Sequence, residues 1–247
     1  MPDRPTSVLI VDDDADTRRN LADILSDLGY RTSTAEDGPA ALAEIARSPF
    51  DIVLLDFKMP GMNGLEVYRA LRDRRPETVA IVISAYTDVA TRQDALDLGV
   101  TDVLTKPVDF RHLLAIVERA SGEPLVLVID DDNDLCIALR DVLREKGYRV
   151  GSASNCRSAA ERLRERHYQI VLVDMQLPDG DGTGLARFVH EADPAARTVI
   201  ITGHREELDA GVKRAIAEGA DAVCYKPFDV PALLRTLENL AGRKPAT

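Results

Sequence analysis

The sequence predicts a doubly wound α/β fold that occurs twice, as two domains that each hold a five-stranded parallel sheet. Short β-branched apolar runs alternate with longer segments of helical period, which is typical of parallel sheets with helices on both faces. The runs 8–11 and 52–55 are apolar throughout, as expected of central strands covered from both sides. The same order of segments and polar residues recurs in both halves, and a repeat of this length indicates two whole domains.

The first half contains the patterns of five strands and five helices. The segment 20–28 has leucine or isoleucine at positions i, i+3, i+4 and i+7, and Gly29 follows as a stop. Further helices are expected at 40–46, 65–71, 91–98 and 110–120. Strands are expected at 7–11, 31–35, 51–55, 79–83 and 103–105.

The second half repeats this order after a short joint. Its strands are expected at 125–129, 149–153, 169–173, 198–201 and 223–225, and its first helix is closed by Gly147. Pro124 stops the preceding helix and stiffens the joint. We therefore predict a first domain over 1–120, a linker over 121–124 and a second domain over 125–247.

Composition narrows the class of protein. The chain has 247 residues, 45% of them hydrophobic and 30% charged, which describes a globular protein. Its net charge of −11 argues against a nucleic-acid partner, which would need a basic face. Three cysteines lack metal-ligand spacing and fit a reducing compartment. No run is long enough for a signal sequence or a membrane span, so we expect a cytoplasmic protein that does not contact a membrane.

One set of polar residues occurs twice in the sequence, once in each half. Asp12 to Asp56 spans 44 positions, as does Asp130 to Asp174, and a hydroxyl residue follows 28 positions later in each half. The first set is Asp12, Asp13, Asp56, Ser84 and Lys106; the second is Asp130, Asp131, Asp174, Thr202 and Lys226. All stand at or just past strand ends, and in a doubly wound sheet the carboxyl ends of the strands form the ligand site. Each set is therefore expected to converge at one sheet edge.

The chemistry of each set points to a divalent cation and a phosphoryl group. Three carboxylates about 5 Å apart repel by roughly 3 kcal/mol a pair at an effective dielectric of 20. One Mg²⁺ or Mn²⁺ per domain, together with the lysine, would balance their charge. An aspartate facing a metal and an ammonium is placed to attack phosphorus. The hydroxyl would then bind an added oxygen and draw the following loop inward.

Both halves resemble the receiver domains of two-component response regulators, which have a flavodoxin-like (βα)5 fold. The resemblance rests on the acid pair, the runs from Asp56 to Pro60 and from Asp174 to Pro178, the strand-end hydroxyl and the final Lys-Pro. It implies a phosphorelay protein whose aspartates, Asp56 and Asp174, accept phosphate from a histidine kinase or a histidine phosphotransfer protein. The downstream partner is unknown, and a homodimer stays open as an assembly.

The resemblance also implies individual roles. The metal would be bound by Asp13, Asp56 and the Lys58 carbonyl, with Asp12 helping through water. The equivalents are Asp131, Asp174, the Gln176 carbonyl and Asp130. Ser84, Lys106, Thr202 and Lys226 would bind the phosphate and switch the domain, and the bonds before Pro107 and Pro227 would be cis. The chain departs from the family in having Val103 and Val223 where an aromatic often stands, and in two extra residues between Thr202 and Lys226.

Two alternatives remain. The chain is either complete in itself or the receiver portion of a larger hybrid kinase or regulator. The run from Asp14 to Thr17 also resembles the nucleophile motif of haloacid-dehalogenase-like phosphatases, but its twin from Asp132 to Leu135 lacks the threonine. We instead expect Asp14 and Asp132 to cap helices. On this interpretation the protein is not an enzyme beyond catalysing its own phosphorylation and dephosphorylation.

Overall fold

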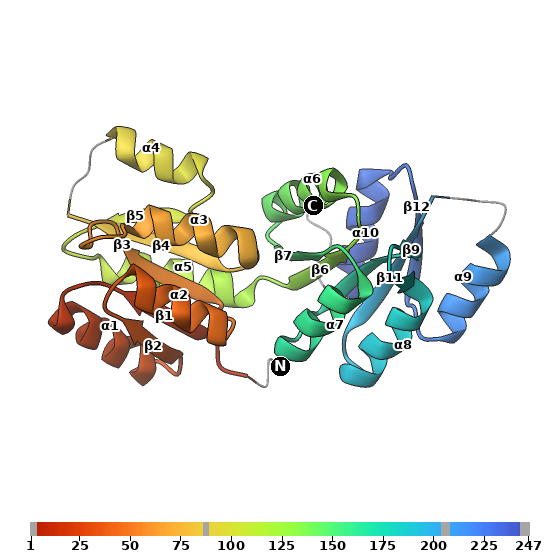
Figure 1. Ribbon diagram of the computed structural model, residues 1–247, viewed down its shortest axis with the longest axis horizontal. Coiled ribbons are helices and arrows are strands. Elements are labelled where there is room, and N and C mark those ends of the chain that lie inside the picture. The colour runs from red at the N-terminus through yellow and green to blue at the C-terminus, as the bar shows by residue number, and fades with distance from the viewer. Residues whose placement is uncertain (1–3, 86–88, 204–207, 243–247) are drawn as a thin grey trace. The chain divides into compact units, whose positions relative to one another are not determined.

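The computed structural model describes residues 4–85, 89–203 and 208–242 (Figure 1). They belong to two compact units, Met1–Glu123 and Pro124–Thr247. Each unit alternates strands and helices around its own sheet. Within the described residues no helix has the length and apolar character that a bilayer crossing requires.

Among its described residues, the first domain has five strands and five helices in strict alternation. Its strands are β1 (Ser7–Val11), β2 (Arg31–Ala35), β3 (Ile52–Asp56), β4 (Val79–Ser84) and β5 (Asp102–Thr105). Its helices are α1 (Ala15–Asp27), α2 (Gly38–Arg47), α3 (Gly64–Arg74), α4 (Val89–Asp97) and α5 (Phe110–Gly122). The strand order is β2-β1-β3-β4-β5 and every pair is parallel, so the predicted fold class is confirmed.

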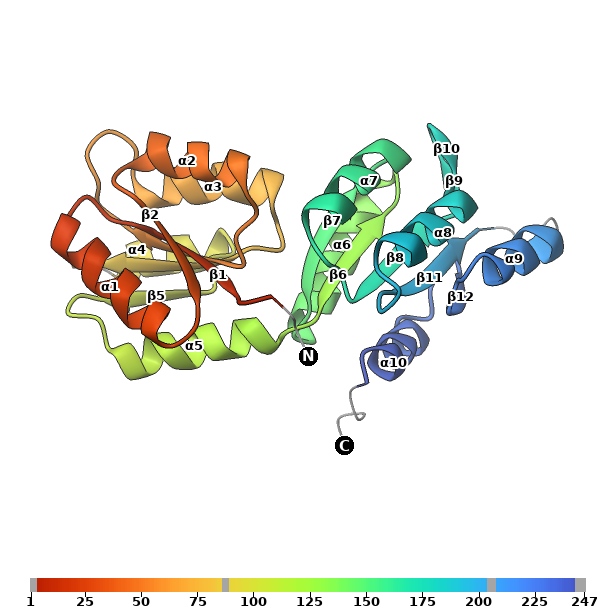
Figure 2. The ribbon, with the colours of Figure 1, turned by 90° about the horizontal axis from the view of Figure 1, so that it is seen from below.

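The sheet of the first domain lies between two apolar layers (Figure 2). Side chains of α2, α3 and α4 cover one face, where Leu9, Val53 and Val82 point. Side chains of α1 and α5 cover the other face, where Val8 and Ile10 point. Because neighbouring residues of β1, β3 and β4 are buried on opposite faces, these strands are apolar without alternation.

The second domain repeats this architecture with one addition. Its main strands are β6 (Leu125–Ile129), β7 (Arg149–Ala153), β8 (Ile170–Asp174), β11 (Arg197–Thr202) and β12 (Ala222–Tyr225). Its helices are α6 (Asn133–Glu145), α7 (Cys156–Glu165), α8 (Gly182–Ala192), α9 (Leu208–Ala217) and α10 (Val230–Leu240). These strands are parallel and stand in the order β7-β6-β8-β11-β12, which is the same order of equivalent strands as in the first sheet. The addition is a two-stranded hairpin, β9 (Gln176–Leu177) with β10 (Gly180–Asp181).

The structure differs from the predicted element boundaries at the linker and at the strand ends of the site, where β4 and β11 also include Ser84 and Thr202. Helix α5 continues to Gly122 and so occupies half of the predicted linker 121–124, because neither Ser121 nor Gly122 interrupts the helix before Pro124. Strands β3 and β8 include Asp56 and Asp174 as their last residues. The aspartates are therefore anchored by the sheet itself.

Candidate functional site

In the first domain, four strand ends bring the predicted residues to one edge of the sheet. Asp12 follows β1, Asp56 ends β3, Ser84 ends β4 and Lys106 follows β5. Lys106 Nζ lies 2.8 Å from Asp12 Oδ2 and 3.2 Å from Asp56 Oδ2. Both carboxylates are almost fully buried, so the ammonium is their direct counterion at close range.

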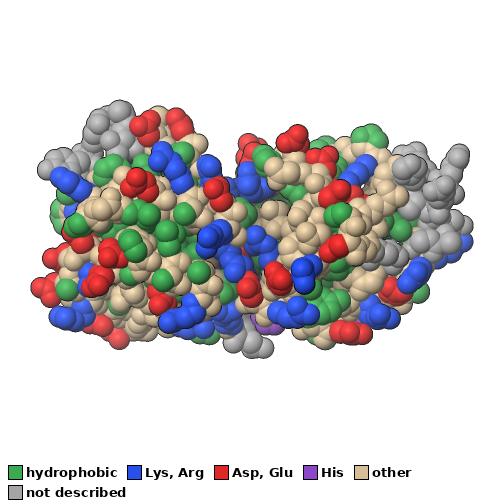
Figure 3. Space-filling view, in the orientation of Figure 1, with side chains coloured by type: hydrophobic (Ala, Val, Ile, Leu, Met, Phe, Trp, Pro, Cys, Tyr) green, Lys and Arg blue, Asp and Glu red, His purple; other side chains and the backbone are tan. Residues whose placement is uncertain are grey.

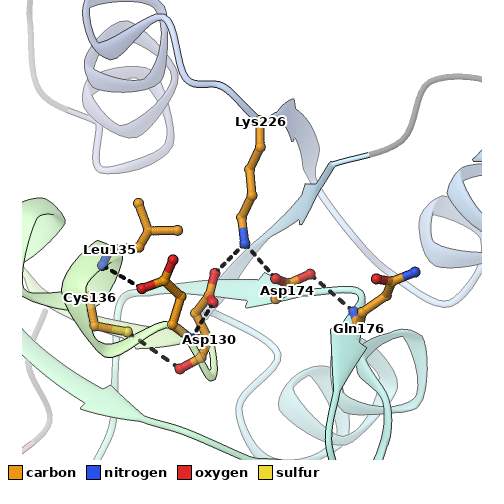
Figure 4. Close-up of polar contacts among 7 residues, drawn as sticks. Asp130, Leu135, Cys136, Asp174, Gln176 and Lys226 are labelled. Carbon is orange, nitrogen blue, oxygen red and sulfur yellow. Dashed lines mark hydrogen bonds and ion pairs between the residues drawn. The ribbon is translucent and has the colours of Figure 1, made fainter.

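The second domain builds the same arrangement (Figure 4). Lys226 Nζ lies between two carboxylates, 2.7 Å from Asp130 Oδ2 and 2.6 Å from Asp174 Oδ2. The other oxygen of Asp174 accepts a hydrogen bond from the Gln176 amide at 3.0 Å. Asp130 Oδ1 likewise accepts from the Asp132 amide at 3.0 Å. Backbone donors and the lysine thus fix the orientation of both buried carboxylates.

The acid pair of each domain divides into a buried and an exposed member. Asp12 and Asp130 are each 1% exposed, whereas Asp13 and Asp131 face solvent. In each domain carboxylate oxygens of the pair and of the strand-end aspartate lie within 4.8 Å of one another. Hard oxygen donors from an open, acidic edge are the ligands that Mg²⁺ prefers, so the donor set fits that ion.

The two hydroxyl residues are buried at the neighbouring strand end. Ser84 is 2% exposed and Thr202 is 3% exposed. Their carbonyls accept hydrogen bonds from the amides of Lys106 at 2.8 Å and Lys226 at 2.7 Å. The hydroxyl residue and the lysine are therefore tied to each other through the backbone. Both bonds that follow the lysines, to Pro107 and Pro227, are cis.

The third acid of each run caps a helix, as the sequence predicts. Asp14 accepts a hydrogen bond from the Thr17 amide at the start of α1, and Asp132 accepts one from the Leu135 amide at the start of α6. The Thr17 amide also lowers the pKa of Asp14. These contacts account for the acidic runs without the phosphatase motif, in which Asp14 would be the nucleophile.

Burial opposes the negative charge of each site. Desolvation and the nearby Asp12 carboxylate raise the pKa of Asp56, although Lys106 acts in the opposite direction. Desolvation also raises the pKa of Asp130, against its hydrogen bond with Lys226. Burial alone would lower the pKa of each lysine, but hydrogen bonds to the aspartates raise the pKa of both. Each lysine is therefore charged, yet it does not fully compensate the anions around it.

We expect Asp56→Asn to increase the free energy of unfolding at neutral pH by about 1 kcal/mol, a common size for a stabilising substitution. A carboxyl whose pKa rises on folding stabilises the native state most below its ordinary value of 3.8. That stabilisation is lost as the pH rises through the raised pKa, and asparagine removes the loss. Denaturant unfolding of the full chain should show a gain that shrinks toward acidic pH, with exposed Asp23→Asn as the neutral control. A loss of stability that is equal at neutral and at acidic pH would contradict this account.

Two glycines are essential to the geometry of the site. In the sequence alone they are recognisable only because they occupy equivalent positions in the two halves. Gly64 opens α3 and Gly182 opens α8. A Cβ built on either would overlap the carbonyl oxygen of the preceding aspartate, Asp56 or Asp174. The start of the helix therefore lies directly on the backbone of the strand-end aspartate. The repetition of glycine eight residues after both aspartates was the available signal.

A structural difference between the domains appears where the family often has an aromatic. In the first domain Arg92 of α4 donates to the Val103 carbonyl at 2.9 Å and to Asp102 at 3.1 Å. His112 Nε2 of α5 lies 3.1 Å from the other Asp102 oxygen. Polar contacts thus connect α4, β5 and α5. The corresponding positions of the second domain are Val212, Ala222 and Ala232, which cannot make them.

Comparison with known proteins agrees with this geometry. The response regulator receiver domain model matches twice, over residues 8–118 and 126–238. The response regulator receiver protein Anae109_2439 of Anaeromyxobacter sp. (strain Fw109-5) is 35% identical over 233 residues, 94% of either chain. The sensory transduction protein RegX3 of Mycobacterium tuberculosis (strain ATCC 25618 / H37Rv) is 39% identical over 133 residues, 53% of this chain and 55% of RegX3. The chain thus spans about half the length of that relative.

A solved structure shows a similar match over one domain. The CheY-like response regulator receiver domain protein from Methanospirillum hungatei JF-1 is 24% identical, with a TM-score of 0.47, and the match covers 49% of this chain and 95% of that one. The family model matches both halves, and a relative matches nearly the whole length. The chain therefore belongs to the response regulator receiver domain family of two-component signalling and carries two such domains in tandem.

Proposed function

We propose that each domain accepts a phosphoryl group on its strand-end aspartate, Asp56 in the first and Asp174 in the second. The observation that carries the proposal is the lysine that contacts both this aspartate and the buried acid of the pair, found in both domains. An ammonium at this position can pair with the carboxylate before the transfer and with the negatively charged phosphoryl oxygens during and after it. The chain is then a phospho-acceptor rather than an enzyme acting on a separate substrate.

One Mg²⁺ per domain is the cofactor that the donor set supports. We assign it to Asp13, Asp56 and the Lys58 carbonyl, with Asp12 helping through water. In the second domain the same places belong to Asp131, Asp174, the Gln176 carbonyl and Asp130. The acidic cluster of each domain is consistent with this assignment. When bound, a divalent cation offsets negative charge on the transferred group.

The transfer can be written with the residues of the chain. A carboxylate oxygen of Asp56 forms a bond to phosphorus, while the bond from phosphorus to the donor's imidazole nitrogen breaks. The electron pair of that bond stays on the imidazole, which takes a proton from solvent. Lys106 stays protonated and pairs with a phosphoryl oxygen, as its raised pKa favours. Asp174 and Lys226 have these roles in the second domain.

Ser84 and Thr202 would convert the transfer into a change of shape. Each hydroxyl would donate a hydrogen bond to an oxygen of the new phosphoryl group. Because their carbonyls bind the lysine amides, this movement would displace the strand ends of β4 and β5, or of β11 and β12, together. The surface formed by the following helices would then differ between the two states.

The phosphate donor that we propose is a histidine kinase or a histidine phosphotransfer protein, in keeping with the family. The protein that recognises the phosphorylated state would be another partner.

A nucleic-acid role is disfavoured by the net charge of −11. On the face drawn in Figure 3, acidic and basic side chains are interspersed over the first domain.

The test uses the unmodified full chain with acetyl phosphate, in the presence and absence of Mg²⁺. Intact mass spectrometry should find up to two phosphoryl groups per chain with Mg²⁺ and none after chelation. Mg²⁺ alone should raise the melting temperature, because an ion that binds only the native state stabilises it by mass action. Absence of any adduct, together with a melting temperature that Mg²⁺ does not change, would refute the proposed function.

A further inference from the structure

The loop that follows the phospho-acceptor aspartate is held in place differently in the two domains. In the second domain this loop folds into the β9–β10 hairpin, whose register pairs Leu177 with Gly180 and Gln176 with Asp181. Its turn consists of Pro178 and Asp179. The hairpin begins with Gln176, whose amide binds Asp174 and whose carbonyl is a proposed metal ligand. The position of the hairpin therefore bears directly on the site.

Asp179 fastens this hairpin to the start of α7. Its Oδ1 accepts a hydrogen bond from the Cys156 amide at 2.8 Å, and its Oδ2 accepts one from the Arg157 amide at 3.1 Å. These are the first two amides of the helix, which have no partner within the helix itself. The third, of Ser158, binds the N-cap Asn155. Both carboxylate oxygens thus accept hydrogen bonds from residues more than twenty positions away in the sequence.

The first domain lacks the acceptor of this contact and one of its two donors. The residue equivalent to Asp179 is Gly61, which has a φ of +79° and no side chain to accept a hydrogen bond. The residue equivalent to Arg157 is Pro39, which has no amide hydrogen to donate. The acceptor and the Arg157 donor are thus absent together, while Gly38, the equivalent of Cys156, keeps its amide. A joint absence is expected if the Asp179 carboxylate and the Arg157 amide serve each other.

An apolar contact replaces the missing one. Met62 packs over Gly38 at the start of α2, where an added Cβ would lie only 2.6 Å from Met62 Cβ. In the second domain the sizes are exchanged: Gly180 stands at the place of Met62, and Cys156 at the place of Gly38. A Cβ added to Gly180 would lie 3.2 Å from Cys156 Sγ. The same loop therefore touches the same helix end in both domains, through different side chains.

We propose that Asp179 is a positioning residue of the second site. Its carboxylate holds the loop against the start of α7, as Met62 holds the equivalent loop against the start of α2 in the first domain. By anchoring the hairpin on α7, it holds the Gln176 backbone in register with Asp174. This inference rests on the proposed function, because it concerns the loop that would complete the metal site. It makes the second site dependent on a polar, solvent-exposed contact that the first site does not have.

The test compares Mg²⁺ binding at the two sites within one full-length chain. In NMR titrations of ¹⁵N-labelled protein, the amide signal of Gly64 reports the first site and that of Gly182 the second. Asp179→Ala should weaken Mg²⁺ binding at the second site about tenfold, the lower end of effects seen for outer-shell residues, and leave the first unchanged. Asp179→Asn, which keeps one acceptor oxygen, should have an intermediate effect. The Cys156 and Arg157 amides should exchange hydrogen faster in both variants.

Two further variants separate positioning from general stability. Asp193→Ala removes a half-buried carboxylate beyond the far end of α8, which accepts from the Ala195 amide and lies 3.2 Å from His167 Nδ1, and it should change neither binding constant. The triple variant Cys156→Gly, Asp179→Gly, Gly180→Met copies the apolar contact of the first domain and should restore Mg²⁺ binding. Normal binding at both sites in Asp179→Ala would overturn the inference and leave the proposed function intact. Failure of the unmodified chain to bind Mg²⁺ at either site would instead refute the proposed function.

Discussion

Asp56→Asn and Asp174→Asn should each remove one of two phosphoryl adducts, and the double variant should take up none. The expected effect on each site is complete loss, because asparagine has no anionic oxygen with which to attack phosphorus. The two sites belong to separate sheets with separate lysines, so each loss should leave the other site unaffected. Intact mass spectrometry after acetyl phosphate treatment counts the adducts, and peptide mapping locates the one that remains.

The matched controls are Asp14→Asn and Asp132→Asn. These aspartates belong to the same acidic runs but cap α1 and α6, so both adducts should persist. Asparagine is also a good N-cap residue, and the helices should therefore remain intact. An adduct that survives in the Asp56→Asn, Asp174→Asn double variant would show that another group accepts phosphate. Loss of both adducts in a single variant would show coupling between sites that we do not expect.

The sequence was sufficient to predict the strands and the convergence of the site. Continuous apolar runs such as 8–11 are buried on both faces, a pattern that a parallel sheet requires. Polar residues at the ends of such strands meet at one edge, and the contacts of Lys106 and Lys226 follow from that rule. Long-range convergence could be predicted here because the topology of a doubly wound sheet determines it.

The contacts of the loop after Asp174 could not be predicted in the same way. The hydrogen bonds of Asp179 depend on where the start of α7 lies in space, and no periodicity encodes that distance. The signal was present only as a comparison between halves, in the joint exchange of Asp179 for Gly61 and Arg157 for Pro39. Likewise, Val103 indicates an absent aromatic, but it does not indicate that Arg92 binds its carbonyl. Side-chain partners outside the repeated set required the structure.

Gly182→Ala and Gly184→Ala should change the stability of the second domain in opposite directions, although only one residue separates them in α8. A Cβ at position 182 would overlap the Asp174 carbonyl oxygen and lie 3.0 Å from its carbon and 3.1 Å from the Met175 Cα. All three atoms are backbone, so no side chain can rotate away. We expect a loss of about 3 kcal/mol in the free energy of unfolding, within the range for a substitution that forces a core backbone to shift.

Gly184 provides the control because a Cβ there would meet nothing within 4 Å. Alanine at that position should stabilise the helix by up to about 1 kcal/mol through its higher helix propensity. Denaturant unfolding measures both effects, and phosphorylation of Asp174 adds a functional reading, since only Gly182→Ala would displace the backbone of the acceptor. Equal and small effects of the two variants would mean that α8 does not need to lie directly on the strand end. The placement of Asp174 at the site would then depend on the ion pair with Lys226 and the hairpin contact, not on the close approach of helix and strand.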